Sequence, residues 1–252
     1  MDSRRTLLTA LLCVVQGGLL ACSASSPPAE LSPPDRFAWS QGRFDNEDFG
    51  SAARGFQDFV IRDPLSPLVD SAQFMMAESY LRGGRELEAA EEFSRLSTTR
   101  PNSPWADDAQ FGACRAYWEA SPKVALSQEF TDLAIEGCQR LLDFFPTSPL
   151  RVEAEGRIAE ARSKKAEKSY DIAQYYYKRK LYESANVYLE KALTELPAPE
   201  LLPKVLVMQY RSYQLVGFEA EAETARERLL REFPDSEEAR EVRDEGDGGE
   251  NR

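Results

Sequence analysis

Residues 89–103 read AAEEFSRLSTTRPNS, and the pattern of this stretch recurs along most of the chain. Ala89, Phe93 and Leu96 are spaced by four and three positions, so a helix would place all three on one face. Pro101 cannot continue a helix interior, and the serine two positions after it can cap the next helix. The stretch therefore predicts the second helix of a helical pair and the start of the pair that follows.

The same offsets recur around five prolines. An alanine stands twelve positions before each proline, in the pairs Ala52 and Pro64, Ala89 and Pro101, Ala134 and Pro146, Ala185 and Pro197, and Ala222 and Pro234. The fifth position before each proline is also apolar, and it holds Phe59, Leu96, Leu141, Ala192 and Leu229. The eighth position holds Phe56, Phe93, Cys138 and Leu189, and only Arg226 is polar. Serine follows four of the prolines by two positions, as Ser66, Ser103, Ser148 and Ser236.

The spacing of these prolines indicates stacked helical hairpins. They are 37, 45, 51 and 37 residues apart, and the shorter intervals are close to the 34-residue tetratricopeptide period. A small alanine lets two helices approach closely, and the large residues on the same face fill the space between them. We therefore predict an all-α, tetratricopeptide-like α-solenoid of about five helix-turn-helix repeats.

The N-terminus carries the pattern of an export signal. Two arginines precede an apolar stretch that ends in LLAC at 19–22, and this stretch is shorter than the roughly 20 residues that a membrane-spanning helix needs. A cysteine directly after a small residue resembles a lipobox, where lipoprotein precursors are lipidated and cleaved. We expect a signal peptide at 1–21 and lipid attached to Cys22. Ser23 is not the aspartate that marks inner-membrane retention in enteric bacteria, which favours the outer membrane.

Composition sets the domain boundaries. Residues 22–35 form a Pro- and Ser-rich segment typical of a flexible tether. The repeats occupy 36–240, and 241–252 is an acidic, Gly-rich tail that we expect to be disordered.

The charge and the absent histidines exclude several classes of function. A net charge of −12 is poorly suited to nucleic acid, whose phosphates are bound by Lys and Arg. With no histidine, the chain can form neither a Ser-His nor a Cys-His nucleophile pair. Paired carboxylates could still act on a glycan, but the acidic residues are scattered along the polar helix faces. We therefore expect no enzymatic activity, no metal and no cofactor.

Two cysteines remain for the folded part of the chain. Cys13 leaves with the signal peptide and Cys22 would carry lipid, so Cys114 and Cys138 are left. They can form a disulfide in an oxidising compartment, or they can be two buried thiols in the core. The sequence favours neither, because it does not set the separation of their Cα atoms.

A tyrosine-rich segment is the candidate partner-binding region. Three consecutive tyrosines cover almost 200° of a helix, so they cannot all face one core. Tyrosine is enriched at interfaces because it has an apolar ring and a polar tip. The candidate residues are Tyr175, Tyr176, Tyr177, Arg179 and Tyr182.

The middle of the chain carries a family resemblance. Gln128 and Thr131 open a helix that ends in FPTS at 145–148, and a long charged helix then leads to IAQYYYKR at 172–179. Together with the lipobox and the five repeats, this pattern resembles BamD, the tetratricopeptide lipoprotein family of the outer-membrane β-barrel assembly machinery.

The resemblance implies a scaffold anchored by lipid on the periplasmic face of the outer membrane. Its C-terminal repeats would bind a periplasmic domain of the barrel-forming assembly subunit. Its N-terminal repeats would bind the terminal strand signal of unfolded outer-membrane proteins. The alternative is another repeat lipoprotein, which acts as an adaptor in peptidoglycan synthesis or cell division.

Overall fold

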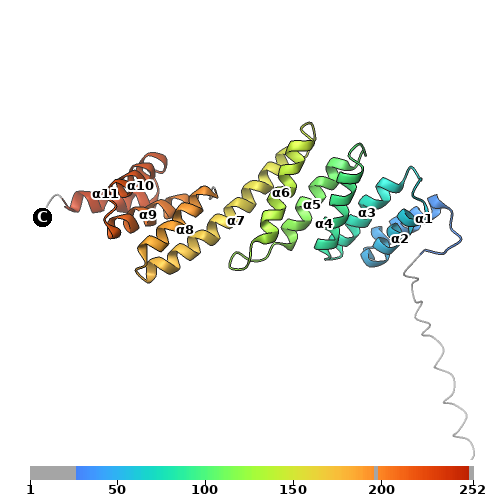
Figure 1. Cartoon of the computed structure of the whole chain (residues 1–252), viewed down its shortest axis with the longest axis horizontal. Coiled ribbons are helices and arrows are strands. Elements are labelled where there is room, and N and C mark those ends of the chain that lie inside the picture. Colours follow the sequence, from blue (N-terminus) through green and yellow to red (C-terminus); the bar gives the residue numbers. More distant parts are fainter. Residues whose placement is uncertain (1–26, 196–197, 250–252) are drawn as a thin grey trace, which may run out of the picture.

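A computed structural model describes residues 27–195 and 198–249, and within them the chain forms eleven α-helices and no strand. The helices are α1 (Pro33–Asp45), α2 (Phe49–Arg62), α3 (Val69–Arg82), α4 (Glu86–Thr99), α5 (Ala106–Ala120), α6 (Glu129–Phe144), α7 (Arg151–Lys178), α8 (Tyr182–Thr194), α9 (Leu202–Val216), α10 (Glu219–Glu232) and α11 (Glu237–Gly249). Figure 1 shows them in one elongated row, in which each helix lies beside its neighbours in the sequence. The all-α solenoid of five helical pairs is thereby confirmed, with α11 added after the fifth pair.

The proline pattern marks the ends of the even-numbered helices. α2, α4, α6 and α10 each end two residues before their proline, and Pro197 lies outside the described residues. All five patterned alanines are buried against neighbouring helices, with at most 2% of their surface exposed. The five residues at the fifth position before a proline are completely buried as well.

The four serines close the turns into the next helices. The hydroxyls of Ser66, Ser103 and Ser148 each accept a hydrogen bond from the amide two residues later, at 3.2 Å. Ser236 accepts from the Ala239 amide at 3.1 Å and caps α11. The serines therefore satisfy amide groups at helix starts that would otherwise lack a partner.

The long helix α7 accounts for the widest proline interval and ties the third repeat to the fourth. Lys165, in its middle, pairs with Asp132 of α6 at 2.7 Å and with Glu195, at the end of α8, at 3.0 Å. One residue earlier, the Lys164 ammonium donates to the Ser121 hydroxyl at 2.7 Å. Burial lowers the pKa of Lys164.

The Gln128 and Thr131 motif shapes the loop between α5 and α6. The Gln128 amide donates to the carbonyls of Lys123 and Leu126, each at 3.1 Å, and its Oε1 accepts from the Thr131 hydroxyl at 2.7 Å. Thr131 is completely buried. The motif therefore acts inside the fold, by closing a loop.

Cys114 and Cys138 form a disulfide between α5 and α6, with their Cα atoms 5.1 Å apart. Both residues are also completely buried in the core. Gly137 allows this close approach, because a Cβ at that position would lie 3.2 Å from the Cα of Cys114. The choice that the sequence left open is settled in favour of the disulfide.

Both predicted boundaries of the solenoid were too narrow. The tether was expected to reach residue 35, but α1 begins at Pro33 and is capped by Ser32. The disordered tail was expected from residue 241, but α11 continues to Gly249. The reason is that Ala239 and Val242 are completely buried, in a cluster that also contains Leu206 and other residues of α9 and α10. The predicted signal peptide and Cys22 lie outside the described residues.

Candidate docking site

A hollow of about 300 Å³ lies where α7, α9 and α11 meet. All three belong to the odd-numbered helices, near the C-terminal end of the row (Figure 1). We call it the C-terminal hollow, and its lining residues are Tyr170, Tyr177, Lys204, Val207, Met208, Arg211 and Glu238. Its size is at the lower end of the range for small-molecule pockets, so it suits a side chain better than a large ligand.

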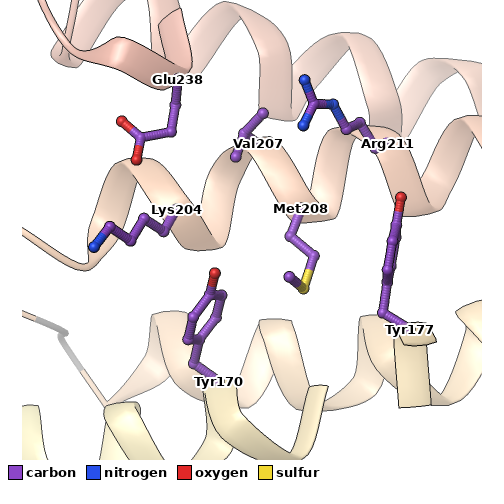
Figure 2. Close-up of a pocket in the computed structure, with 7 residues that line it drawn as sticks. All are labelled: Tyr170, Tyr177, Lys204, Val207, Met208, Arg211 and Glu238. Carbon is purple, nitrogen blue, oxygen red and sulfur yellow. The ribbon is translucent and has the colours of Figure 1, made fainter. Parts of the chain in front are cut away.

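The helical repeat explains why these side chains converge. Tyr170 and Tyr177 are seven residues apart on α7 and therefore share one face. The four residues from α9 follow the i, i+3, i+4, i+7 spacing, which likewise places them on one face. Figure 2 shows Met208 between the two tyrosines and Lys204 between Tyr170 and Glu238.

The C-terminal hollow combines an apolar floor with a charged rim. Val207 and Met208 supply the floor, and the unbranched thioether of Met208 adapts to different shapes. At the rim, Arg211 is held by an ion pair with Glu241 of α11 at 3.0 Å. Within the described residues, the exposed Lys204 makes no ion pair. This arrangement suits noncovalent binding of an amphipathic or aromatic group.

The opposite face of α9 is fixed in place by α8. The Tyr213 hydroxyl donates to the Glu190 carboxylate at 2.6 Å, and the Ser212 hydroxyl donates to the Tyr182 carbonyl at 3.1 Å. Burial, together with the hydrogen bond to Glu190, raises the pKa of Tyr213 to about 12. These contacts tie α9, which supplies the floor of the C-terminal hollow, to α8.

The five candidate residues fall into two groups. Tyr177 lines the C-terminal hollow and packs edge-on against Tyr182, with ring centroids 5.3 Å apart. Tyr175 is 52% exposed, with the Arg179 guanidinium 3.7 Å from its ring centroid. Tyr176 packs against Tyr175 and stacks on Tyr188 of α8 at 5.5 Å. The three tyrosines therefore face different surroundings, as their spacing required.

The sequence reasoning missed most of the C-terminal hollow. Apart from Tyr177, none of its lining residues was among the candidates. Lys204, Val207 and Glu238 lie seven, ten and four positions after their prolines, so the repeat offsets could have located them. The repeat pattern identifies the core positions, whereas the hollow is lined by positions that lie outside that pattern.

Two further properties concern the described residues as a whole. None of their helices combines the length and the apolar character needed to cross a bilayer. The same residues contain no group of three or more His, Cys, Asp or Glu side chains that could hold a metal ion.

A family model described as YfiO, outer membrane lipoprotein, matches residues 30–229, from just ahead of α1 into the last turn of α10. The chain belongs to the YfiO family. This is the BamD family domain, so the resemblance seen in the sequence is confirmed. The protein is accordingly a tetratricopeptide protein of an outer membrane lipoprotein family.

Comparison with curated protein sequences finds no match. Among solved structures, the TPR2AB domain of yeast Sti1 in a complex with pHSP90 is 13% identical, with a TM-score of 0.41, and the match covers 82% of this chain and 80% of that one. PilF of Pseudomonas aeruginosa is 14% identical, with a TM-score of 0.36, and the match covers 84% and 97% of the two chains. MamA is also 14% identical, with a TM-score of 0.36, and the match covers 79% and 90%. Likeness this weak carries no argument about function.

Proposed function

We propose that this YfiO family protein is a non-catalytic scaffold of the β-barrel assembly machinery on the periplasmic face of the outer membrane. It would bind the barrel-forming assembly subunit and unfolded outer-membrane proteins. The observation that carries the proposal is the family match over 30–229, which includes nearly all of the solenoid. Stacked helical pairs form extended binding surfaces of the kind that such a scaffold needs.

The anchor in this proposal is lipid on Cys22. The short segment between Cys22 and the Ser32 cap of α1 would hold the solenoid close to the membrane. Replacing Cys22 with Ser should leave an uncleaved or soluble precursor, which mass spectrometry of the membrane fraction would reveal. The same mature, membrane-bound species in wild type and variant would contradict lipidation at Cys22.

Two separate hollows are consistent with two classes of partner. The C-terminal hollow lies beside the tyrosine segment of α7, where we propose that the barrel-forming subunit docks. A second hollow of about 300 Å³ lies among α2, α3 and α4, lined in part by Ile61, Met76 and Arg95. Ile61 is 70% exposed, and such an apolar side chain beside a cation suits an unfolded, partly apolar chain. We propose that these N-terminal repeats receive the outer-membrane protein substrates.

Affinity copurification from outer membranes tests the proposal. The tagged protein should capture the barrel-forming assembly subunit as its main partner. Recovery of peptidoglycan-synthesis or cell-division proteins in its place would favour the adaptor function. A test variant carries Tyr175→Ala, Tyr176→Ala and Arg179→Ala, which together remove the patch outside the C-terminal hollow. If that patch is part of the docking surface, recovery of the subunit should fall.

A further inference from the structure

The junction between the second and third repeats is filled by an aromatic stack. The Trp105 indole, at the start of α5, stacks on Phe74 of α3 with ring centroids 4.6 Å apart. Its Nε1 donates to the Ser71 hydroxyl at 2.9 Å. Trp105 is four residues after Pro101, whereas Ser71 and Phe74 are seven and ten residues after the preceding proline.

The same three positions line the C-terminal hollow. In the last junction, the position of Trp105 is taken by Glu238, that of Phe74 by Val207 and that of Ser71 by Lys204. Where the junction of α3 and α5 has the ring of Trp105, the last junction has the carboxylate of Glu238, in the first turn of α11. Where it has Phe74, the last junction has the smaller, aliphatic Val207. The ring that fills the junction of α3 and α5 therefore has no counterpart in the last junction.

The two intermediate junctions are filled by apolar residues. Leu150, at the equivalent position before α7, packs in the same cluster as Phe111 of α5. Leu201, at the equivalent position before α9, packs in the same cluster as Tyr170 of α7. The equivalent position before α3 is also apolar, as Leu68, so among the five such positions only the one in α11 is charged. This substitution explains why the C-terminal hollow is open.

We propose that the C-terminal hollow receives an aromatic side chain from a partner polypeptide, in the place that Trp105 fills within the chain itself. The inference rests on the proposed scaffold function, because it names what one docking site of that scaffold would recognise. The two tyrosines would meet the incoming ring along its edges, and the Met208 sulfur would contact it, an interaction that aromatic rings favour.

The charges at the rim support an aromatic occupant over an aliphatic one. Lys204 stands where the junction of α3 and α5 has a neutral serine, and an exposed ammonium is attracted to the face of an aromatic ring. The indole or phenol of an incoming side chain could also donate to Glu238. An aliphatic side chain would gain neither contact.

Methionine-methyl NMR tests whether a ring binds here. The mature lipoprotein lacks Met1, so it has three methionines, Met75, Met76 and Met208. Met208 lines the C-terminal hollow and Met76 lines the N-terminal one, which makes Met76 an internal control. The mature lipoprotein in lipid nanodiscs would be titrated with N-acetyltryptophanamide. We expect a saturable upfield shift of the Met208 methyl signal, caused by the ring current, with the Met76 signal unmoved.

N-acetylleucinamide is the control probe, and it should shift Met208 much less. An unmoved Met208 signal with the tryptophan probe would overturn the proposal. Equal shifts of Met76 and Met208 would also overturn it, because they would indicate nonspecific binding. If the leucine probe shifted Met208 as much as the tryptophan probe, the hollow would bind apolar groups in general, and the proposal of an aromatic site would be overturned.

A self-filled variant connects the hollow to the partner. Val207→Phe with Glu238→Trp rebuilds the pair that fills the junction of α3 and α5, so the probe should no longer shift Met208. Glu237→Trp is the matched control, since it places the same ring at the neighbouring exposed position, which does not line the hollow. Circular dichroism would check the fold of each variant. If the double variant does not fold, Glu238→Trp alone is the smaller change that still obstructs the hollow.

Copurification with these variants separates this inference from the proposed function. Loss of the barrel-forming subunit in the self-filled variant, with retention in Glu237→Trp, would support the aromatic site. Capture by the self-filled variant at the wild-type level would overturn the site and leave the scaffold function standing. If wild type itself captured no such subunit, the proposed function would fail, and the Met208 titration would decide alone whether the hollow accepts a ring.

Discussion

The Tyr213 hydroxyl couples two neighbouring repeats through one short hydrogen bond. It lies in α9 and donates to the Glu190 carboxylate of α8 at 2.6 Å. Burial is the main cause of its raised pKa, because a phenolate would lose its hydration, and the negative charge of Glu190 adds to the effect. The hydrogen bond therefore forms only at a pH at which the Tyr213 hydroxyl keeps its proton.

We predict that this contact makes the protein less stable at alkaline pH. The pKa of Tyr213 is about 12 in the folded protein and about 10 in the unfolded chain, so the folded state holds more protons between these values. Its contribution to stability is complete below pH 10 and is lost as the pH rises towards 12. Tyr213→Phe should lower the free energy of unfolding by about 2 kcal/mol at pH 8, since a hydrogen bond to a charged group is lost.

Urea unfolding of wild type and Tyr213→Phe at pH 8, 9, 10 and 11 would measure the effect. The difference between the two proteins should narrow above pH 10. A difference that stays constant to pH 11 would show that the Glu190 contact does not control the ionisation. Tyr175→Phe is the control at an exposed ring, and it should change stability by less than about 0.5 kcal/mol.

Among the helices of the described chain, α5 and α6 are the only pair joined by a disulfide. The sequence reduced four cysteines to two but could not choose between a disulfide and buried thiols. That choice depends on a distance between two helices, which the packing of Gly137 against Cys114 sets. A residue pattern along one helix carries no such information.

We predict that the disulfide stabilises the solenoid by about 3 kcal/mol, because it closes a loop between residues 24 apart in sequence. Cys114→Ala with Cys138→Ala should lower the midpoint of thermal unfolding, measured by circular dichroism. Dithiothreitol should lower the midpoint of wild type and leave that of the double variant unchanged. A reductant that affects both equally would contradict a role for this bond.

The last helix shows where composition misled the prediction. The segment after residue 240 is acidic and rich in glycine, which is typical of disorder, yet Val242 is completely buried. Val242 is eight residues after Pro234, and the equivalent positions Ala72, Ala109, Ala154 and Val205 are all buried too. The repeat offset therefore predicts that Val242 is buried, whereas the average composition of the tail predicts disorder.

We predict that α11 covers the end of the core through Ala239 and Val242, of which Val242 has the larger side chain. Val242→Asp would bury an unpaired carboxylate against Leu206 and should destabilise the docking of α11 by about 2 to 4 kcal/mol. Hydrogen exchange should then be faster in the amides of α11 and along the face of α9. Asp244→Ser, at an exposed position on the same helix, should leave both unchanged. Similar exchange in the two variants would mean that α11 does not depend on Val242.

At the scale of the molecule, the repeat pattern predicted the architecture well and the docking site poorly. Five prolines and five alanines located the even-numbered helices because each repeat obeys the same local rules. The C-terminal hollow arises where a repeat breaks those rules, at Glu238, and it takes shape only when three helices come together. A break in the pattern is visible in the sequence, but its consequence depends on the side chains of the neighbouring helices.

The row of helices also determines how instability spreads. One buried cluster joins α2 to α5 and another joins α9 to α11, and the two share no residue. In a solenoid, each repeat is stabilised by its immediate neighbours, so a local defect should remain local. We predict that Leu206→Ala, which costs about 2 to 5 kcal/mol, speeds hydrogen exchange in α9 to α11 and leaves α2 to α4 protected.

Leu96→Ala is the reciprocal variant, because Leu96 is completely buried in the N-terminal cluster. It should speed exchange in α2 to α5 and leave α9 to α11 as in wild type. Mass spectrometry of peptides from both variants gives the comparison within one experiment. If either substitution removed protection along the whole row, α7 would be transmitting unfolding between the clusters. Binding at the C-terminal hollow could then change the stability of the N-terminal repeats, whereas local unfolding would leave the two hollows energetically independent.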